Sequence, residues 1–158
     1  MRHPEIAYIV NLQGDEPLIK PESIDEVAKN VKFDETADIS TLIRKITPQE
    51  AENPNLVKCI VDCNGFAMYF SRSKIPYERN AGKADFFGHL GIYGYKREAL
   101  IKMTEMTQTS YEMAESLEQL RALQNGMRIK TSVVDFVPVG IDTAEDLEKF
   151  KSIIAKVV

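Results

Sequence analysis

Apolar runs of strand length alternate with segments of helical periodicity along the chain. The run at 6–12 is rich in β-branched and aromatic residues, which predicts a strand covered on both faces and central in a parallel sheet. A tight polar turn at 13–17 follows, and Pro21 is placed to begin a helix whose apolar residues recur at helical spacing. Further strands are predicted at 37–46, 86–95 and 128–134.

The remaining segments complete an alternating pattern. Two β-rich runs, 57–62 and 66–71, flank Asn64-Gly65, which is a strong hairpin signal. We expect a short helical turn at 47–50, a surface loop at 72–85, and helices at 96–106, 110–124 and 143–158, the last capped by Thr143. This alternation favours an α/β fold, a sheet flanked by helices. With no repeat or obvious linker, the chain is expected to form one α/β domain over 1–158.

Charge and composition exclude several function classes. The 158 residues include 20 Lys and Arg against 24 Asp and Glu, a net charge of −4 that argues against a nucleic-acid partner. No apolar run approaches the roughly 18 residues of a membrane span, and the N-terminus lacks the apolar core of a secretory signal. We therefore expect a soluble cytosolic protein with no membrane partner. Cys59 and Cys63 would lie roughly 13 Å apart on one strand, too far to bridge, and are interpreted as reduced thiols.

Two aspartates follow β-rich stretches at turns. Asp15 lies at the carboxyl end of the first predicted strand, where open α/β sheets collect ligands, and Asp142 lies beside a helix N-terminus. Mg²⁺ takes one or two carboxylates and completes its shell with water and phosphate oxygens, so either aspartate could hold it. The alternatives are an acidic surface turn for Asp15 and a helix-capping acid for Asp142.

A polar and aromatic face is predicted on the strand at 86–95. The period of two puts His89, Gly91, Tyr93 and Tyr95 on one face, with room at Gly91 for a hydroxylated ligand. The alternative is a satisfied histidine between aromatic rings. Arg72 ends the preceding strand, where its guanidinium could recognise an anionic substrate or simply be solvated.

The helix predicted at 110–124 carries a core stripe of Met113, Leu117, Leu120 and Leu123. Glu118 and Gln119 are expected to lie off this stripe. From spacing alone, Glu118 is interpreted as an ordinary ion-pair partner of Arg121.

Five segments carry a family resemblance and occur in one order: 10–19 (VNLQGDEPLI), 69–77 (YFSRSKIPY), 89–95 (HLGIYGY), 117–121 (LEQLR) and 140–147 (GIDTAEDL). Together they closely resemble the 3-deoxy-manno-octulosonate (Kdo) cytidylyltransferase family. The resemblance runs from Ile6 almost to the C-terminus.

The resemblance implies a Rossmann-like mixed sheet with a β-hairpin-containing dimerisation lobe, and a homodimer. It implies an enzyme of lipopolysaccharide biosynthesis that uses Mg²⁺ to transfer CMP from CTP to Kdo with release of pyrophosphate. Asp15 and Asp142 would be the catalytic metal ligands, and Gln13 would lie beside nucleotide and sugar. Arg72 would face the Kdo carboxylate. The residues contacting the sugar hydroxyls would be His89, Tyr93, Glu118 and Gln119.

The sequence departs from the family pattern at its beginning. Family members start with a strand and a basic, glycine-containing loop that holds the triphosphate and cytosine, and this sequence starts after that region. We therefore expect the N-terminal part of the sheet to be missing and the isolated chain to show little or no turnover. The alternative from another class is a non-catalytic sugar-acid-binding or dimerisation module.

Overall fold

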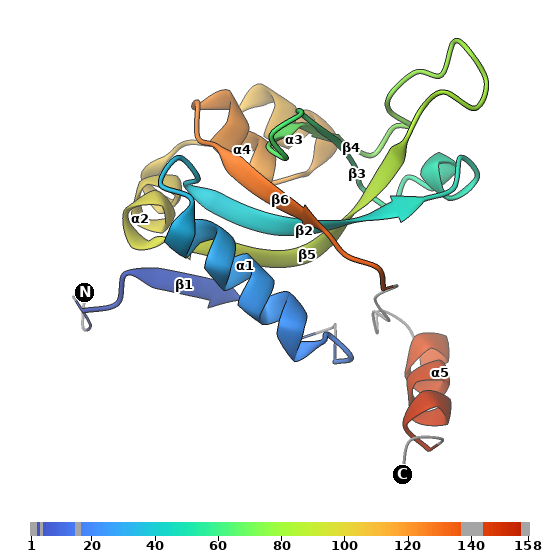
Figure 1. Ribbon diagram of the computed structural model, residues 1–158, viewed down its shortest axis with the longest axis horizontal. Coiled ribbons are helices and arrows are strands. Elements are labelled where there is room, and N and C mark those ends of the chain that lie inside the picture. The colour runs from blue at the N-terminus through green and yellow to red at the C-terminus, as the bar shows by residue number, and fades with distance from the viewer. Residues whose placement is uncertain (1–2, 4, 15–16, 137–143, 156–158) are drawn as a thin grey trace.

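Residues 3, 5–14, 17–136 and 144–155 are described by the computed structural model (Figure 1). The elements follow in this order: β1 (Tyr8–Asn11), α1 (Pro21–Phe33), β2 (Ile39–Ile46), η1 (Glu50–Glu52, a 3₁₀ turn), β3 (Lys58–Val61), β4 (Ala67–Ser71), β5 (Phe86–Lys96), α2 (Arg97–Glu105), α3 (Ser110–Glu115), α4 (Gln119–Gln124), β6 (Ile129–Val133) and α5 (Ala144–Ile154). The predicted mixed α/β sheet flanked by helices is confirmed.

The sheet is organised around the long strand β5. Its strand order is β4-β3-β5-β2-β6, and β1 also pairs with β5. Only the β2–β6 pair is parallel; the other strand pairs in the described chain are antiparallel. One edge of β5 pairs with β2, and the other pairs with β3 at Gly88 and with β1 at 93–96.

The first strand differs from its prediction. β1 runs antiparallel to β5 and has no second partner among the described residues, so it is not a central parallel strand. Ile6, Tyr8 and Leu12 are exposed, and the inward contacts come from Ile9 and Val10. An unbroken apolar run was interpreted as burial on both faces, but this run is half covered.

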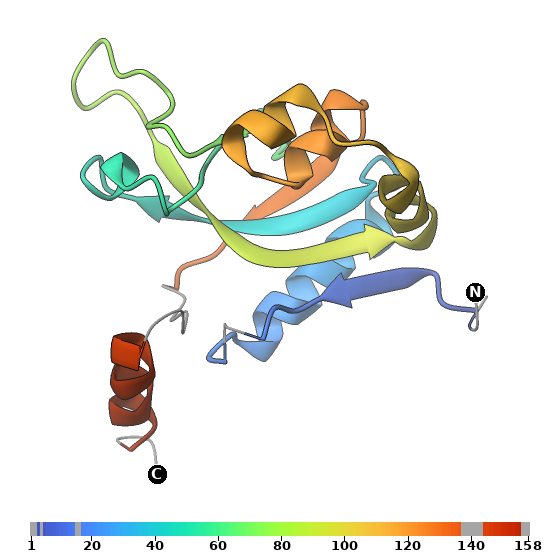
Figure 2. The ribbon, with the colours of Figure 1, turned by 180° about the vertical axis from the view of Figure 1, so that it is seen from behind.

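Helices cover both faces of the sheet (Figures 1 and 2). On one face, Val27 of α1 packs on Leu42, Leu90 and Ile92. This close approach requires Gly94, because a Cβ atom there would lie 2.9 Å from the carbonyl oxygen of Val27.

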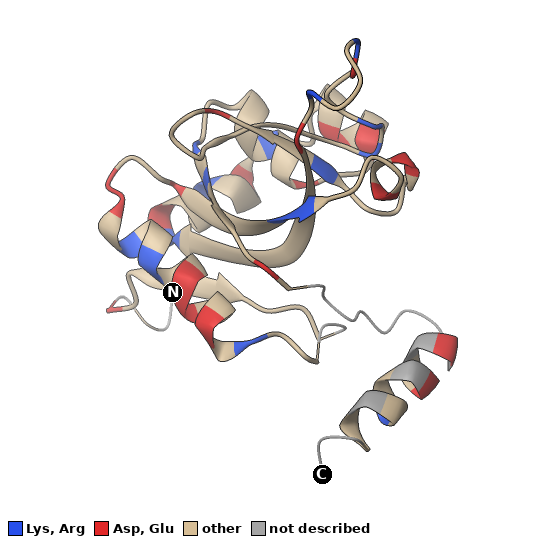
Figure 3. Ribbon diagram, turned by 45° about the vertical axis from the view of Figure 1, so that its right-hand side comes forward, with Lys and Arg blue, Asp and Glu red and all other residues tan. Residues whose placement is uncertain are grey.

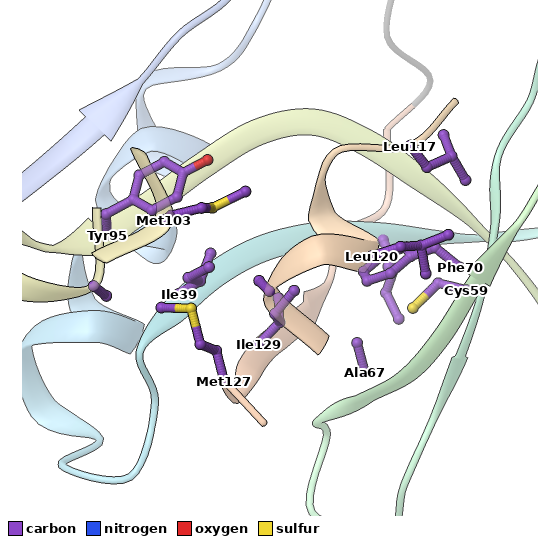
Figure 4. Close-up of a cluster of buried hydrophobic side chains, with 13 residues drawn as sticks. Ile39, Cys59, Ala67, Phe70, Tyr95, Met103, Leu117, Leu120, Met127 and Ile129 are labelled. Atoms are coloured by element: carbon purple, nitrogen blue, oxygen red, sulfur yellow. The ribbon is translucent and has the colours of Figure 1, made fainter. Parts of the chain in front are cut away.

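The larger hydrophobic core lies on the opposite face, between the sheet and the helices α2–α4. Figure 4 shows Tyr95 and Met103 at one end of this core, and Leu120, Phe70 and Cys59 at the other. The first end borders the cavity described below.

The β3–β4 hairpin confirms its prediction. Gly65 has φ of +77°, which glycine adopts readily, and the Asp62 N–H donates to the Phe66 carbonyl at 2.8 Å. The Asp62 carboxylate also accepts the N–H groups of Asn64 and Phe66, each at 2.8 Å. The loop at 72–85 extends from the end of β4 without regular structure, as expected (Figure 1).

The helix predicted at 110–124 is divided into α3 and α4. Ser116 adopts φ of +53°, a left-handed conformation that ends α3. As a result, Met113 is 62% exposed and does not belong to the core, whereas Gln119, expected off the core stripe, is 6% exposed. The periodicity of one continuous helix could not hold across this turn.

Surface charge is mixed in sign. Figure 3 shows Lys and Arg segments interspersed with Asp and Glu segments along the described ribbon. No described helix is long and apolar enough to cross a membrane. Cys59 is buried and Cys63 exposed, and both thiols are free, as predicted.

Candidate functional site

A cavity of about 200 Å³ lies where the end of β1, β5, α2 and the α3–α4 turn meet. Its lining includes four residues singled out in the sequence: Gln13, Tyr93, Glu118 and Gln119. The other lining residues are Ile39, Tyr95, Met103, Ser116 and Leu117. The fold therefore brings together segments that are more than 100 positions apart in the chain.

Several polar groups in this cavity have no hydrogen-bond partner in the part of the chain that the structure describes. Gln119 is buried, yet within the described part of the chain its side-chain amide makes no hydrogen bond. The same holds there for the hydroxyls of Tyr93 and Tyr95. Buried polar groups are almost always hydrogen-bonded, so these amide and hydroxyl groups are available to water or to a polar ligand.

Both tyrosines remain hydrogen-bond donors at neutral pH. Burial raises the pKa of Tyr93 well above its usual value, with further contributions from Tyr95 and Glu118. Burial, assisted by Glu118, raises the pKa of Tyr95 to about 12. Their neutral phenols can each donate one hydrogen bond and accept others, which suits the hydroxyls of a sugar.

The turn at Ser116 positions Glu118 and Gln119. The Leu117 N–H donates to the Glu112 carbonyl at 3.3 Å, and α4 then begins beside the cavity. Glu118 keeps a 70% exposed side chain and lies 3.6 Å from the Arg121 guanidinium, which confirms the predicted ion pair. Arg121 also forms a two-bond pair with buried Glu112, which fixes α4 against α3.

His89 lies behind Tyr93, outside the cavity lining. Its ring centroid is 5.3 Å from that of Tyr93 and 5.1 Å from that of Phe70, and its Nε2 is 2.8 Å from Thr41 Oγ1. Burial lowers the pKa of His89 to about 3, so the ring is neutral at neutral pH. The predicted shared face with Tyr93 is confirmed, and this setting also matches the alternative of a satisfied histidine between aromatic rings.

Arg72 lies on the other side of the α3–α4 turn. Its Nε donates to the Glu115 carbonyl at 2.8 Å, and its two terminal nitrogens donate to the carbonyls of Pro54 (3.3 Å) and Ser116 (3.5 Å). Among the described residues, no carboxylate oxygen lies within 4 Å of the guanidinium nitrogens. The positive charge is therefore held in place by neutral carbonyls and is free to attract an anion.

The two predicted metal ligands, Asp15 and Asp142, lie outside the described residues. Within the described ranges, no three His, Cys, Asp or Glu side chains gather in a way that could hold a metal ion. The magnesium site therefore stays a prediction.

Sequence reasoning missed part of the cavity wall. Met103 and Leu117 carry only an ordinary apolar signal, and Ser116 carries none, because its left-handed conformation is usually marked by Gly or Asn. Tyr95 was placed on the correct face but was given no role. A neighbouring hollow of about 300 Å³ shares Tyr95, Met103 and Glu118 with the cavity and continues it beneath β1.

Comparison with known proteins gives consistent results. The chain is 46% identical over 146 residues to the 3-deoxy-manno-octulosonate cytidylyltransferase of Fusobacterium nucleatum, a match covering 92% of this chain and 60% of that protein. It is 45% identical to the protein of the same name from Chloroherpeton thalassium (94% and 62% covered) and 40% identical to that of Escherichia coli (99% and 63%). The chain thus spans somewhat less than two thirds of the length of these curated relatives.

A solved structure of CMP:2-keto-3-deoxy-manno-octonic acid synthetase complexed with CTP superposes with a TM-score of 0.94 at 39% identity, covering all of this chain and 66% of the other. The sequence model of the family described as Cytidylyltransferase matches residues 1–129. This match includes every described segment that lines the cavity. The chain therefore belongs to the cytidylyltransferase family.

Proposed function

We propose that this chain forms the sugar-acid-binding part of a 3-deoxy-manno-octulosonate cytidylyltransferase, which joins CTP and Kdo into CMP-Kdo and releases pyrophosphate in lipopolysaccharide biosynthesis. The observation that carries the proposal is the cavity lined by the Gln119 amide and the Tyr93 and Tyr95 hydroxyls, which have no hydrogen-bond partner among the described residues. The 40–46% identity to relatives of that name supports this substrate.

The polar side chains that line the cavity suit a sugar acid. Gln119 offers two N–H donors and a carbonyl acceptor, the tyrosines offer hydroxyls, and Glu118 offers a carboxylate that accepts only. A site built to hydrogen-bond hydroxyls rejects analogues that lack them, because its own polar groups are then left unpaired. We expect Kdo hydroxyls to occupy this wall and His89 to support Tyr93 from behind.

Arg72 is proposed to attract the Kdo carboxylate. Three of the five guanidinium N–H groups are used by backbone carbonyls, which leaves two for an external anion. Because Ser116 both accepts from Arg72 and lines the cavity, the charge lies next to the proposed sugar site.

In the proposed reaction, the anomeric hydroxyl of Kdo attacks the α-phosphorus of CTP. The sugar oxygen forms a bond to the α-phosphorus, the bond from that phosphorus to the pyrophosphate oxygen breaks, and the hydroxyl proton passes to water. The chain's contribution is to bind and orient the sugar, since such transfers depend mainly on positioning and charge neutralisation. Asp15 and Asp142 are proposed to hold Mg²⁺, which would neutralise phosphate charge, and Gln13 is proposed to lie beside nucleotide and sugar.

We further propose that the protein is a homodimer. We also propose a cytoplasmic location, which the two free thiols support.

Calorimetry and a pyrophosphate-release assay test the proposal together. We expect heat on titration with Kdo, and an affinity about tenfold lower for Gln119→Leu, which removes hydrogen bonds from the buried wall. Tyr77→Phe is the matched control, because Tyr77 is 89% exposed on the loop after β4 and should leave affinity unchanged.

The outcomes separate the candidate functions. Kdo binding together with CTP binding in the presence of Mg²⁺ indicates the enzyme, with little or no pyrophosphate release expected from this chain alone. Kdo binding without CTP binding indicates the non-catalytic sugar-acid-binding module. No heat from Kdo at millimolar concentration would contradict both.

A further inference from the structure

Lys58 is a buried lysine in the middle of the sheet. It lies on β3 opposite Ser71 of β4 and Gly88 of β5, and is 0% exposed. Lysine is almost never fully buried unless its charge is paired, and burial lowers the pKa of Lys58. No described carboxylate oxygen lies within 4 Å of its ammonium. The charges of Glu115 and Glu52 partly offset the burial, and the direct partners of the ammonium are hydrogen-bond acceptors.

Those bonds go to two backbone carbonyls. The Lys58 ammonium donates to the carbonyl of Arg72 at 2.5 Å and to that of Asn53 at 2.8 Å. It thereby ties the end of β4 to the segment that follows η1. Hydrogen bonds with an ionised donor are shorter and stronger than neutral ones, so this contact restrains the peptide that leaves Arg72.

Glu115 holds the other side of the same residue. Its carboxylate accepts the Arg72 backbone N–H at 2.9 Å and the Ser71 hydroxyl at 2.6 Å. Both backbone polar groups of Arg72 are therefore held by charged side chains from other elements. The guanidinium is aimed from this fixed backbone onto the carbonyls of Pro54, Glu115 and Ser116.

We propose that Lys58 is a positioning residue for Arg72. Its buried ammonium fixes the backbone from which the Arg72 guanidinium extends to the α3–α4 turn, the turn that lines the proposed sugar-acid site. The claim that Lys58 fixes the Arg72 backbone rests only on the hydrogen bonds described above. The expected effect on ligand affinity rests on the proposed function. A lysine that only ties η1 to the sheet would affect stability without affecting the Arg72 side chain.

The direct test is NMR of the Arg72 side chain in the full chain without ligand. The Arg72 Nε–H, bonded to the Glu115 carbonyl, should exchange slowly with water, and Lys58→Met should accelerate this exchange about tenfold or more because the backbone restraint is lost. Cys59→Ala is the control: Cys59 is the next residue on β3 and is buried in the hydrophobic core, and its thiol donates to the neighbouring Ile60 carbonyl and not to the Arg72 backbone. Equal acceleration in both variants, or none in Lys58→Met, would overturn the proposal.

A second measurement tests whether the loss of the Lys58 ammonium also weakens ligand binding. With Kdo as the probe, Lys58→Met should weaken binding about tenfold in the wild-type background and not further in the Arg72→Ala background, because the two act in series. Additive losses would overturn the link to Arg72. If wild-type protein binds no Kdo, the proposed function fails while the exchange measurement still decides the positioning role. If Lys58→Met does not fold, Lys58→Gln, which keeps one amide donor, is measured for the same exchange.

Discussion

Lowering the pH should destabilise the fold through His89. The Thr41 hydroxyl has one proton, which it shares between the carbonyls of Ile92 (2.7 Å) and Leu90 (3.2 Å). The His89 Nε2 that lies 2.8 Å from this hydroxyl must therefore be the donor, so the neutral tautomer carries its proton on Nε2. A second proton on Nδ1 would charge a ring enclosed between Phe70 and Tyr93.

The size and sign of the change in the free energy of unfolding follow from the pKa values of His89 in the unfolded and folded chain. The ordinary value of 6.5 applies to the unfolded chain, and burial lowers the folded value to about 3. As pH falls below about 6.5, His89 binds a proton in the unfolded chain but stays neutral in the folded chain until about pH 3. The folded state therefore loses stability throughout this pH range. Between pH 7 and pH 5 the loss is about 2 kcal/mol, and over the whole window about 5 kcal/mol.

Urea unfolding at pH 7 and pH 5 measures this loss. The wild-type free energy of unfolding should fall by about 2 kcal/mol more than that of His89→Gln, since every other titrating group is common to both proteins. NMR gives the folded pKa directly, because the chain has two histidines and His3→Gln identifies the His89 resonances. An imidazole that titrates near pH 6.5 in the folded protein, or equal pH dependence in both proteins, would refute the reasoning.

Three further outcomes are expected. Gly94→Ala should destabilise the fold by about 1–3 kcal/mol in thermal or urea unfolding, because the added Cβ would lie 2.9 Å from the Val27 carbonyl oxygen. Ser116→Gly should stabilise it by up to about 1 kcal/mol in the same assay, since glycine adopts the left-handed conformation without the strain of a side chain. Iodoacetamide should modify exposed Cys63 and spare Cys59, whose thiol pKa burial raises, so mass spectrometry should show one carbamidomethyl group on the folded protein.

Short sequence motifs predicted those parts of the fold whose conformation depends only on neighbouring residues. Asn64-Gly65 indicated the hairpin because the positive φ of the turn is adopted by the glycine itself, and Pro21 marked the first helical turn. The break at Ser116 was not predictable this way, because a serine in a left-handed turn leaves the apolar periodicity on either side intact. The partial exposure of β1 depends on which strands pair with it, which no local pattern specifies.

The site residues likewise separate into those that the sequence could identify and those that it could not. Strand periodicity placed Tyr93 on a candidate ligand face, whereas spacing left Glu118 and Gln119 ordinary and only the family resemblance gave them a role. The structure then places them in one cavity with Gln13. Lys58 could not be found at all, since a lysine on a strand is normally interpreted as facing solvent. Its contacts depend on carbonyls from two other segments that become neighbours only in the folded chain.

Two irregularities of the backbone shape the site. Between β2 and β5 the register passes from Thr41↔Tyr93 to Leu42↔Leu90, so two residues of β5 bulge out of the ladder. Residues four apart on a regular strand are separated by about 13 Å at Cα, yet the rings of His89 and Tyr93 lie 5.3 Å apart. The left-handed Ser116 likewise ends α3 so that Glu118 and Gln119 line the same cavity as Tyr93. The left-handed conformation of Ser116 costs stability, and Ser116 lines the cavity, as expected when backbone strain is retained to orient a binding site.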